Sequence, residues 1–245
     1  QTDPLGRVTT SSFSATGNLL TSRDPAGNTS TFTYDARGNQ SQTTGPYYAN
    51  VAPVWTTAAY DALDRPVRVT SPDGTYTTTA YGFAYNAADP DFTVPRPCRT
   101  DTDELGHALR QCSDAFGRVV VQSEFSAAGE TRTRYAFDSR GNPTRVWDGA
   151  GNTWSFAYDS LGRKLTASDP DTGTWSYQYD ARGLETAHTD ARGQRTEFAY
   201  DALGRRTAKT TKRVDATVEQ TVTWTYDQGR AGFFNTGRLT TMTDP

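Results

Sequence analysis

Aliphatic residues are scarce in this sequence. Isoleucine is absent, methionine occurs once, and hydrophobic residues make up 34% of the 245 residues. So few aliphatic side chains cannot fill the core of a conventional two-layer domain. No apolar stretch is long enough to span a bilayer, and the N-terminus lacks the basic and apolar regions of a signal peptide. We therefore expect no membrane span.

The charge distribution excludes another group of partners. The net charge is −3, and Lys and Arg residues are dispersed along the chain without forming a basic stripe. Binding of nucleic acid or acidic lipid through bulk positive charge is therefore not expected. Disorder is also excluded, because 5 tryptophans, 13 tyrosines and 11 phenylalanines are too many for a solvated coil.

Catalytic motifs are missing. The two histidines, His107 and His188, lie far apart in the sequence, and neither is next to a nucleophile motif. There is no HExxH, GxSxG or glycine-lysine phosphate loop. We interpret both histidines as surface residues of a sheet, and we predict that the chain is not an enzyme and has no cofactor.

Aspartate-rich loops could instead suggest calcium. The nearest approach to a calcium loop is the pair Asp169 and Asp171, but a downstream glutamate that could bind the ion through both oxygens is missing. Aspartate that forms turns is the favoured interpretation. We therefore predict no metal site.

What the chain does contain is a repeat. One short phrase, which ends in Asp, two further residues and Gly, occurs four times at a spacing of 21 residues. A second, weaker turn phrase falls midway between successive copies. Turns therefore arrive roughly every ten residues. The aspartates of the main phrase are Asp138, Asp159, Asp180 and Asp201, and its glycines are Gly141, Gly162, Gly183 and Gly204.

The chemistry of the phrase predicts hairpins. The aspartate can accept a hydrogen bond from the backbone two residues on, the middle pair suits a type I turn, and the glycine can take the left-handed conformation. The segments between turns are short and rich in Thr, Ser and aromatic residues, as strands are. The predicted fold class is all-β: a long antiparallel meander of about twenty short strands, which should curl because open sheets rarely exceed ~10 strands.

The register of these hairpins predicts an aromatic stripe. If Asp159 faces Arg163, then Tyr158 pairs with Lys164 and Phe156 pairs with Thr166. The aromatic residues of three successive repeats then share one face, and small and hydroxyl side chains occupy the other face. The predicted stripe consists of Trp154, Phe156, Tyr158, Trp175, Tyr177, Tyr179, Phe198 and Tyr200.

Two interpretations of the stripe are open. The tryptophans Trp147, Trp154, Trp175 and Trp224 could be platforms on which sugars stack. Alternatively, rings on adjacent strands, ~4.8 Å apart, stack on one another and hold the sheet together. We favour the second interpretation, because the rings recur at the register that every repeat requires.

The two cysteines can be placed by the same reasoning. If Asp103 faces His107 across a turn, Cys98 lies directly opposite Cys112 in a non-hydrogen-bonded pair, where the Cα atoms are about 4.5 Å apart. That spacing allows a disulfide. Two unpaired thiols are the alternative, because Pro95 and Pro97 could end the strand before Cys98.

The repeat is interrupted at two places. Residues 45–58 and 83–97 break the rhythm and are predicted to be irregular insertions, because Pro90, Pro95 and Pro97 should prevent central-strand pairing. Otherwise residues 1–245 are predicted to form a single repeat array. Both ends of the chain lie inside repeat-like phrases, so we expect a piece of a longer protein.

The repeated phrase resembles the YD repeat of Rhs (rearrangement hotspot) proteins, of the B and C components of insecticidal toxin complexes, and of teneurins. Further matches begin at Tyr34, Tyr60, Ser113 and Tyr226, so the resemblance spans nearly the whole chain. Two matches depart from the pattern, because Asp64 replaces the turn glycine and the phrase at Tyr226 has lost a residue. Those two turns are the least regular.

The resemblance implies a function. The predicted sheet resembles the wall of the hollow shell in Rhs and toxin-complex proteins. That shell encloses a C-terminal polymorphic toxin, which bacteria use in competition. The implied partners are the rest of the shell, the toxin and proteins of a secretion apparatus, and the implied location is secreted or at the cell surface. The alternative, which resembles teneurins and adhesins, is an extracellular surface that binds carbohydrate or protein. The self-cleavage residues of Rhs proteins have no counterpart in this chain.

Overall fold

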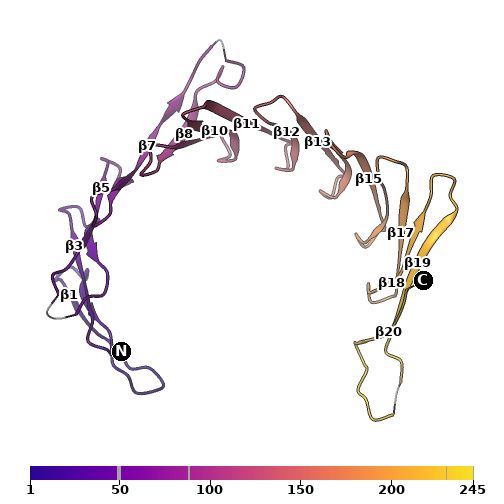
Figure 1. Cartoon of the computed structure of the whole chain (residues 1–245), viewed down its shortest axis with the longest axis horizontal. Helices are drawn as coiled ribbons and strands as arrows, with labels where there is room; N and C mark the ends of the chain where they lie inside the picture. Colours follow the sequence, from indigo (N-terminus) through magenta and orange to yellow (C-terminus); the bar gives the residue numbers. More distant parts are fainter. Residues whose placement is uncertain (49–50, 88, 230, 245) are drawn as a thin grey trace. The chain divides into compact units, whose positions relative to one another are not determined.

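The computed structural model describes residues 1–48, 51–87, 89–229 and 231–244. Twenty strands and no helix occur in this part of the chain (Figure 1), which confirms the all-β class. A helix that could span a bilayer is therefore not found in the described residues. The chain divides into two compact units, 1–132 and 133–245. The prediction of a single array therefore stays a prediction.

In the first unit each strand pairs antiparallel with the next strand along the chain, from β1 to β10. The strands are β1 (Thr10–Phe13), β2 (Leu19–Arg23), β3 (Thr29–Tyr34), β4 (Gln40–Thr44), β5 (Trp55–Tyr60), β6 (Pro66–Thr70), β7 (Tyr76–Ala84), β8 (Arg96–Thr102), β9 (Ala108–Ser113) and β10 (Val119–Ser126).

The second unit repeats this pattern more regularly, from β11 to β20. The first strand, β11, begins before the boundary between the units. The strands are β11 (Gly129–Phe137), β12 (Pro143–Trp147), β13 (Thr153–Tyr158), β14 (Lys164–Asp169), β15 (Gly173–Tyr179), β16 (Glu185–Thr189), β17 (Arg195–Tyr200), β18 (Arg206–Lys212), β19 (Val218–Tyr226) and β20 (Leu239–Thr243).

The register differs from the predicted one by one residue. Tyr158 pairs with Lys164 as expected, but Phe156 pairs with Ala167, so the predicted pair of Phe156 with Thr166 is wrong. Leu165 is the extra residue of a β-bulge. The same shift follows the other three copies of the main phrase. Turns at the opposite ends of these strands, such as that between β14 and β15, have no such shift.

The bulge separates the two faces of the sheet. A one-residue slip moves every later side chain to the other face. Thr166 and Ser168 therefore join the small residues of β13, instead of joining the aromatic residues as predicted. In β13 and β14 the result is one face with the rings and an opposite face of hydroxyl and small side chains.

Both predicted insertions are shorter than expected. Strand β5 begins at Trp55, and β7 and β8 extend to Ala84 and from Arg96, so the irregular segments are 45–54 and 85–95. Ala49, Asn50 and Ala88 within them lie outside the described residues. Pro97 lies in a central strand opposite Phe83, so the prediction that it prevents pairing is wrong. In an antiparallel sheet, opposed residues alternate between hydrogen-bonded and non-hydrogen-bonded pairs. A residue in a non-hydrogen-bonded pair donates no N–H to the opposite residue, so proline can occupy that position.

The two irregular turn phrases have different outcomes. Asp64 keeps the hairpin, because the aspartate itself adopts the left-handed conformation with φ of 61°. The phrase at Tyr226 does not close a short turn. The N–H of Asp227 donates to the carbonyl of Arg238, so a longer loop connects β19 to β20. Arg230 in this loop lies outside the described residues.

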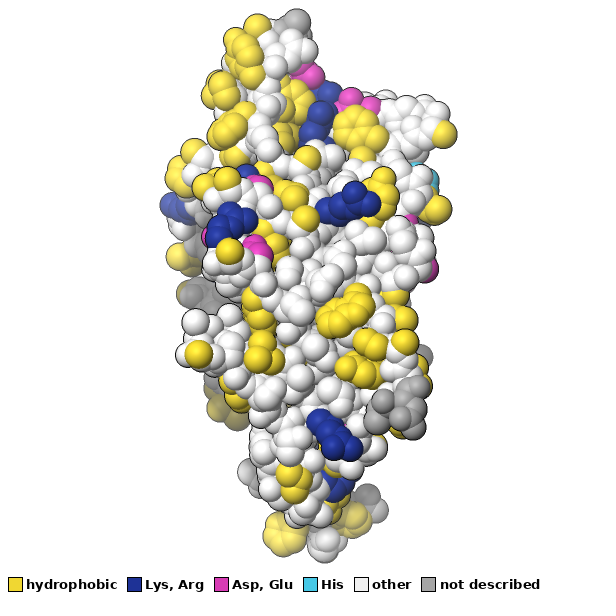
Figure 2. Space-filling view, turned by 90° about the vertical axis from the view of Figure 1, so that its left-hand side faces the viewer, with side chains coloured by type: hydrophobic (Ala, Val, Ile, Leu, Met, Phe, Trp, Pro, Cys, Tyr) yellow, Lys and Arg dark blue, Asp and Glu magenta, His cyan; other side chains and the backbone are white. Residues whose placement is uncertain are grey.

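Very few side chains are fully buried. Among the described residues the buried hydrophobic side chains are Phe92, Cys112, Val121, Ala187 and Val222. On the face shown in Figure 2, hydrophobic side chains are scattered among polar atoms and the Lys and Arg residues stand singly. Strand pairing and turns therefore stabilise this fold more than a core does.

Candidate functional surfaces

The aspartate of each main turn organises the turn through both carboxylate oxygens. In the turn at Asp159, Oδ1 accepts the N–H groups of Leu161 and Arg163 at 2.8 and 2.9 Å. Oδ2 accepts Nε of Arg163 at 2.5 Å. The glycine of the turn, Gly162, is left-handed with φ of 80°. Asp138, Asp180 and Asp201 accept the same two backbone N–H groups, and Gly141, Gly183 and Gly204 are also left-handed.

These hydrogen bonds keep the turn aspartates ionised. Hydrogen bonds from the side chain and then the backbone N–H of Asn142 lower the pKa of Asp138. For Asp180 the backbone N–H of Leu184 is the largest cause of a lowered pKa. A carboxylate that accepts several N–H groups is stabilised in its charged form. The turns are therefore built for the ionised state.

Arginines connect each turn to the next one along the same edge. Besides its own aspartate, Arg163 binds the carbonyl of Asp180 through Nη1 at 2.9 Å and lies over the ring of Tyr179 at 5.1 Å. Arg182 binds the carbonyl of Asp201 at 3.1 Å. Arg205 continues the row by binding Asp227 Oδ2 at 2.6 Å. The turn edge of the second unit is thus a row of linked turns.

Tyrosines connect the repeats a second time. The hydroxyl of Tyr200 donates to the carbonyl of Glu185 at 2.8 Å, and that of Tyr226 donates to the carbonyl of Arg206 at 2.9 Å. Tyr34 and Tyr60 make the equivalent bonds in the first unit. Each acceptor is the first residue of the neighbouring strand that precedes the tyrosine's own strand in the sheet. Sequence reasoning missed this contact, although the preference for Tyr over Phe before the aspartate was a usable signal.

The predicted aromatic stripe lies on one face of β13, β15 and β17, but its rings do not stack on one another. The strands that carry them alternate with strands that do not, so successive rows are two strand spacings, ~9.6 Å, apart. Side chains of the strands in between occupy the space between these rows. Lys164 Nζ lies 4.9 Å from the centroid of the Phe156 ring, and Arg206 Cζ lies 4.2 Å from that of the Phe198 ring. The expectation of direct ring stacking is therefore wrong.

His188 lies at the centre of this face. Its ring is 5.6 Å from Trp175, 6.3 Å from Tyr177 and 5.4 Å from Phe198, measured between ring centroids. Its Nδ1 lies 2.6 Å from Glu185 Oε1. The side chain is 24% exposed, so the interpretation as an ordinary surface residue overlooked its role as the link between aromatic rows. His107, by contrast, lies in an exposed turn beside Asp103.

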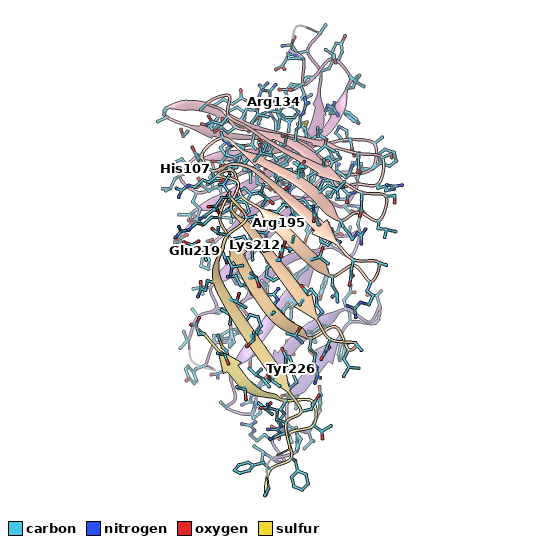
Figure 3. The ribbon with its side chains drawn as sticks, turned by 90° about the vertical axis from the view of Figure 1, so that its right-hand side faces the viewer. His107, Arg134, Arg195, Lys212, Glu219 and Tyr226 are labelled. Atoms are coloured by element: carbon cyan, nitrogen blue, oxygen red, sulfur yellow. A yellow bond between two sulfur atoms is a disulfide. The ribbon has the colours of Figure 1, made fainter. Side chains whose placement is uncertain are left out.

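The opposite face of the second unit carries ion pairs. Glu197 accepts Nε of Arg195 at 3.0 Å and Nζ of Lys212 at 2.6 Å. Arg195 and Lys212 are opposed residues of β17 and β18, as Figure 3 shows. These partly exposed pairs make the face polar and contribute little stability.

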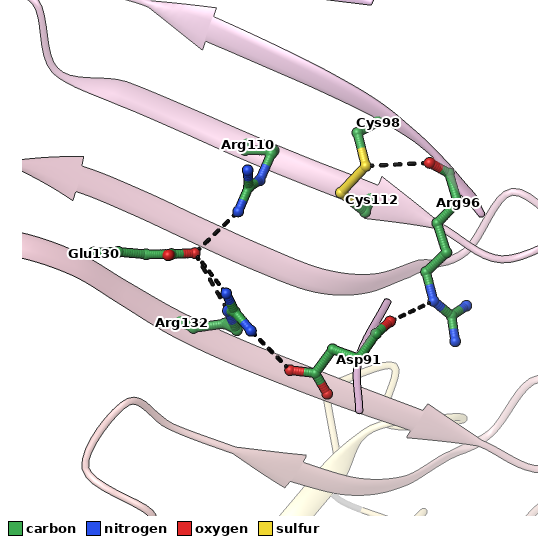
Figure 4. The surroundings of a disulfide bond; sticks show 7 residues. All are labelled: Asp91, Arg96, Cys98, Arg110, Cys112, Glu130 and Arg132. Atoms are coloured by element: carbon green, nitrogen blue, oxygen red, sulfur yellow. Dashed lines mark hydrogen bonds and ion pairs between the residues drawn. A yellow bond between two sulfur atoms is a disulfide. The ribbon is translucent and has the colours of Figure 1, made fainter. Parts of the chain in front are cut away.

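The first unit contains a different cluster around the two cysteines. Cys98 and Cys112 are directly opposed in β8 and β9, with their Sγ atoms 2.00 Å apart in a disulfide. Phe92 from the irregular segment packs against this pair and against Val121. Figure 4 shows the charged groups around it, in which Arg132 binds Asp91 and Glu130. This cluster is the main group of buried side chains in the described part of the first unit.

The described residues offer no group of three or more side chains that could hold a metal ion. Asp169, the aspartate weighed for calcium, instead accepts the backbone N–H groups of Asp171 and Thr172 and the indole N–H of Trp154. The geometry of this turn is that of a hydrogen-bonded hairpin.

Repeated hairpins, linked turn by turn through Asp, Arg and Tyr, define an all-β repeat protein. A family model described as RHS Repeat matches residues 13–48, 137–174, 164–194 and 179–217. Both units of the chain therefore contain RHS repeats. A comparison with curated proteins found no match.

Solved structures with a similar chain include components of Tc toxins. The TcdB2-TccC3-Cdc42 structure is 19% identical over 90% of this chain and 13% of that chain, with a TM-score of 0.44. A mutant Tc holotoxin pore of Photorhabdus luminescens is 19% identical over 90% and 13%, with a TM-score of 0.43. TcdB2-TccC3 without its hypervariable C-terminal region is 17% identical over 96% and 15%, with a TM-score of 0.46. The present chain thus spans less than a sixth of each of these chains.

Proposed function

We propose that this chain is a non-catalytic segment of the wall of an RHS-repeat shell, which encloses a C-terminal toxin until it is delivered. The observation that carries the proposal is the scarcity of buried side chains in a sheet of RHS repeats. A sheet that buries so little on either face is suited to separating two spaces. Its mechanism is steric, because a closed wall isolates its cargo from solvent and from the cell that produces it.

The residues of the repeat have roles in this wall. The turn aspartates fix each hairpin, and the arginines and tyrosines join each hairpin to the next, so the sheet can grow in length without a second layer. These contacts recur along the chain and converge on no single reactive centre. A wall needs such evenly distributed contacts, whereas an enzyme needs a local constellation.

The partners follow from this role. The wall segment contacts the remainder of its own shell and an enclosed toxin, and proteins of a secretion apparatus handle the whole assembly. The proposed location is secreted or at the cell surface, as part of a longer bacterial protein.

Protease protection in the complete polypeptide tests the proposal. The gene that contains residues 1–245 is expressed in full, and the segment that follows residue 245 is followed during digestion. We expect this segment to survive in the wild-type protein and to be cut in a variant whose wall is weakened by Asp159→Ala, Asp180→Ala and Asp201→Ala, because those carboxylates hold three turns.

A matched control alters the same turns without removing their hydrogen bonds. Leu161 and Leu203 are 74% and 78% exposed at the tips of two of them, so Leu161→Ala with Leu203→Ala should leave protection intact. Equal digestion of the downstream segment in wild type and in the aspartate variant would contradict the proposal. A gene in which no further segment follows residue 245 would contradict it as well.

One observation favours a second function, an extracellular surface that binds carbohydrate or protein. Trp175, His188 and Phe198 form a partly exposed ring cluster with the carboxylate of Glu185 beside it. Binding on a glycan array that Trp175→Ala abolishes would favour recognition. Trp147→Ala is the control. Trp147 pairs with Thr153, whereas its neighbour Val146 pairs with Trp154, so Trp147 lies on the face opposite the ring cluster. Absence of binding in the wild-type chain would remove this alternative.

A further inference from the structure

The disulfide of the first unit has one accessible and one inaccessible end. Cys112 is completely buried, whereas Cys98 is partly exposed. Cys98 lines a cavity of about 450 Å³, together with Tyr81, Phe92 and Arg132. A thiol reagent that enters this cavity reaches the disulfide at Cys98.

A short segment covers the disulfide. We call residues 89–95 the strap. Its residue Phe92 is only 4% exposed and packs against Cys112 and Val121, with Cys98 and Ala84 at the margin. Pro90, Val94 and Pro95 of the strap are exposed, so the ring of Phe92 provides its buried apolar contact with the sheet.

Charged groups hold the strap in place. Arg132 Nη1 lies 2.7 Å from Asp89 Oδ2 and 3.2 Å from Asp91 Oδ2. Its Nη2 lies 3.1 Å from Glu130 Oε1, which fixes the guanidinium on the sheet. Arg96 Nε donates to the carbonyl of Asp91 at 2.9 Å (Figure 4). With its guanidinium 5.3 Å from the Phe92 ring, Arg132 contacts the strap through both charge and ring.

The arrangement links strap and disulfide in both directions. Two thiols occupy more space than a bonded pair of sulfurs, and the Cα atoms of Cys98 and Cys112 are only 4.1 Å apart. Reduction therefore pushes the sulfurs apart beneath Phe92. Conversely, displacement of Phe92 uncovers the sulfurs. Coupling of this kind is reciprocal by thermodynamic necessity.

We propose that the strap and the Cys98–Cys112 disulfide form a redox-sensitive clamp, in which the strap slows reduction of the bond and reduction releases the strap. The reductant is a dithiol. Its thiolate attacks Cys98 Sγ, a mixed disulfide forms, and Cys112 leaves as a thiolate that takes up a proton. The second thiol of the reductant then closes on the first, which frees Cys98. Two electrons and two protons pass to the cysteines, and the dithiol becomes a cyclic disulfide.

The clamp gives this segment a different state in oxidising and in reducing surroundings. It goes beyond the proposed wall function and does not depend on it, because both experiments below use only residues 1–245. In a chain that crosses from an oxidising to a reducing compartment, the clamp would open after the crossing.

The first experiment measures the rate of reduction. The chain is treated with excess dithiothreitol, free thiols are trapped with iodoacetamide at intervals, and the mass is recorded. We expect Arg132→Gln to be reduced about tenfold faster than wild type, since it loses charge-assisted hydrogen bonds to two strap carboxylates. Arg195→Gln, which breaks a partly exposed ion pair in the second unit, should match wild type. Equal rates for Arg132→Gln and wild type would overturn the proposal.

The second experiment measures release of the strap and does not require Arg132→Gln to fold. Chymotrypsin cuts after Phe92 only when this buried side chain becomes accessible. We expect this cut to be at least several-fold faster in the reduced chain, and in Cys98→Ser with Cys112→Ser, than in the oxidised chain. Cleavage at Phe234, which is 96% exposed, is the internal control and should not change. Unchanged cleavage at Phe92 after reduction would contradict the coupling.

Discussion

The regular repeats of the second unit and the interrupted segment 84–112 of the first unit are held by different kinds of contact. In the second unit each hairpin is tied to the next by an arginine and a tyrosine, as Arg163 and Tyr200 show. In the interrupted segment a disulfide, a buried ring and a cluster around Arg132 take their place. Contacts between repeats are therefore distributed along the sheet where the repeat is intact and concentrated in one cluster where it is broken.

Loss of the Cys98–Cys112 disulfide should have the largest effect on stability. Reduction of the disulfide opens a loop whose ends are 14 residues apart, which should lower the free energy of unfolding of the first unit by about 3 kcal/mol. Denaturant titrations with and without dithiothreitol measure this difference. The double variant Cys98→Ser with Cys112→Ser should behave like the reduced protein and ignore the reductant. A midpoint in the wild type that does not respond to the reductant would show that the segment does not rely on the bond.

The next effect tests close packing between turns in the second unit. A Cβ on Gly173 would lie 2.5 Å from Cβ of Ala191, and φ at Gly173 is +77°. Gly183 has a similar φ of +88° but nothing within 4 Å, so Gly183→Ala isolates the backbone strain, about 1 kcal/mol. Gly173→Ala should cost roughly 1–2 kcal/mol more, because of the clash.

A double variant sharpens this test. Adding Ala191→Gly to Gly173→Ala removes the second methyl group and should restore stability to the level of Gly183→Ala. If Gly173→Ala and Gly183→Ala cost the same amount in thermal or chemical unfolding, neighbouring turns do not pack as described.

A smaller effect measures one distributed contact. Tyr200→Phe removes the hydroxyl that donates to the carbonyl of Glu185, which should lower stability by about 1 kcal/mol. Tyr177→Phe is the control, because the Tyr177 hydroxyl makes no hydrogen bond to a described residue. Chemical unfolding of both variants gives the comparison. Equal losses would mean that the hydroxyl does not join the repeats.

Ionisation of the turn aspartates should make stability depend on pH, with a small contribution from each residue. The pKa values of the turn aspartates are lowered from 3.8 in the folded chain. A lowered pKa stabilises the folded state above the unfolded value, and this stabilisation is lost as the pH falls through the folded value. The unfolding midpoint should therefore stay constant from pH 7 to 5 and fall below about pH 4. Asp138→Asn should flatten this fall slightly, and an acid-independent midpoint would contradict the account.

The fold could be predicted because its determinants are local. The chemistry of Asp and Gly in a five-residue turn is contained in the turn itself, so the hairpins follow from the sequence. The position of Cys98 opposite Cys112 followed from counting out of one turn. The bulge at Leu165 could not be counted in the same way, because a bulge is set by the pairing of two strands.

The candidate surfaces were less predictable. The aromatic residues were placed on one face by their alternation, but the link through His188 depends on a strand between them. Phe92 and Arg132 are 40 positions apart in the sequence, and no periodicity connects them. The last turn was mispredicted because the sequence supplies two Gly-Arg pairs after Asp227, and the chain uses the second one.

Electron cryo-microscopy of the complete polypeptide that contains this chain tests whether these repeats form the wall of a shell. We expect residues 1–245 to form a sheet one layer thick, with one face toward an enclosed space and the other toward solvent. A second protein layer packed along either face, or a sheet that encloses nothing, would contradict the assignment of this chain to the wall of a shell.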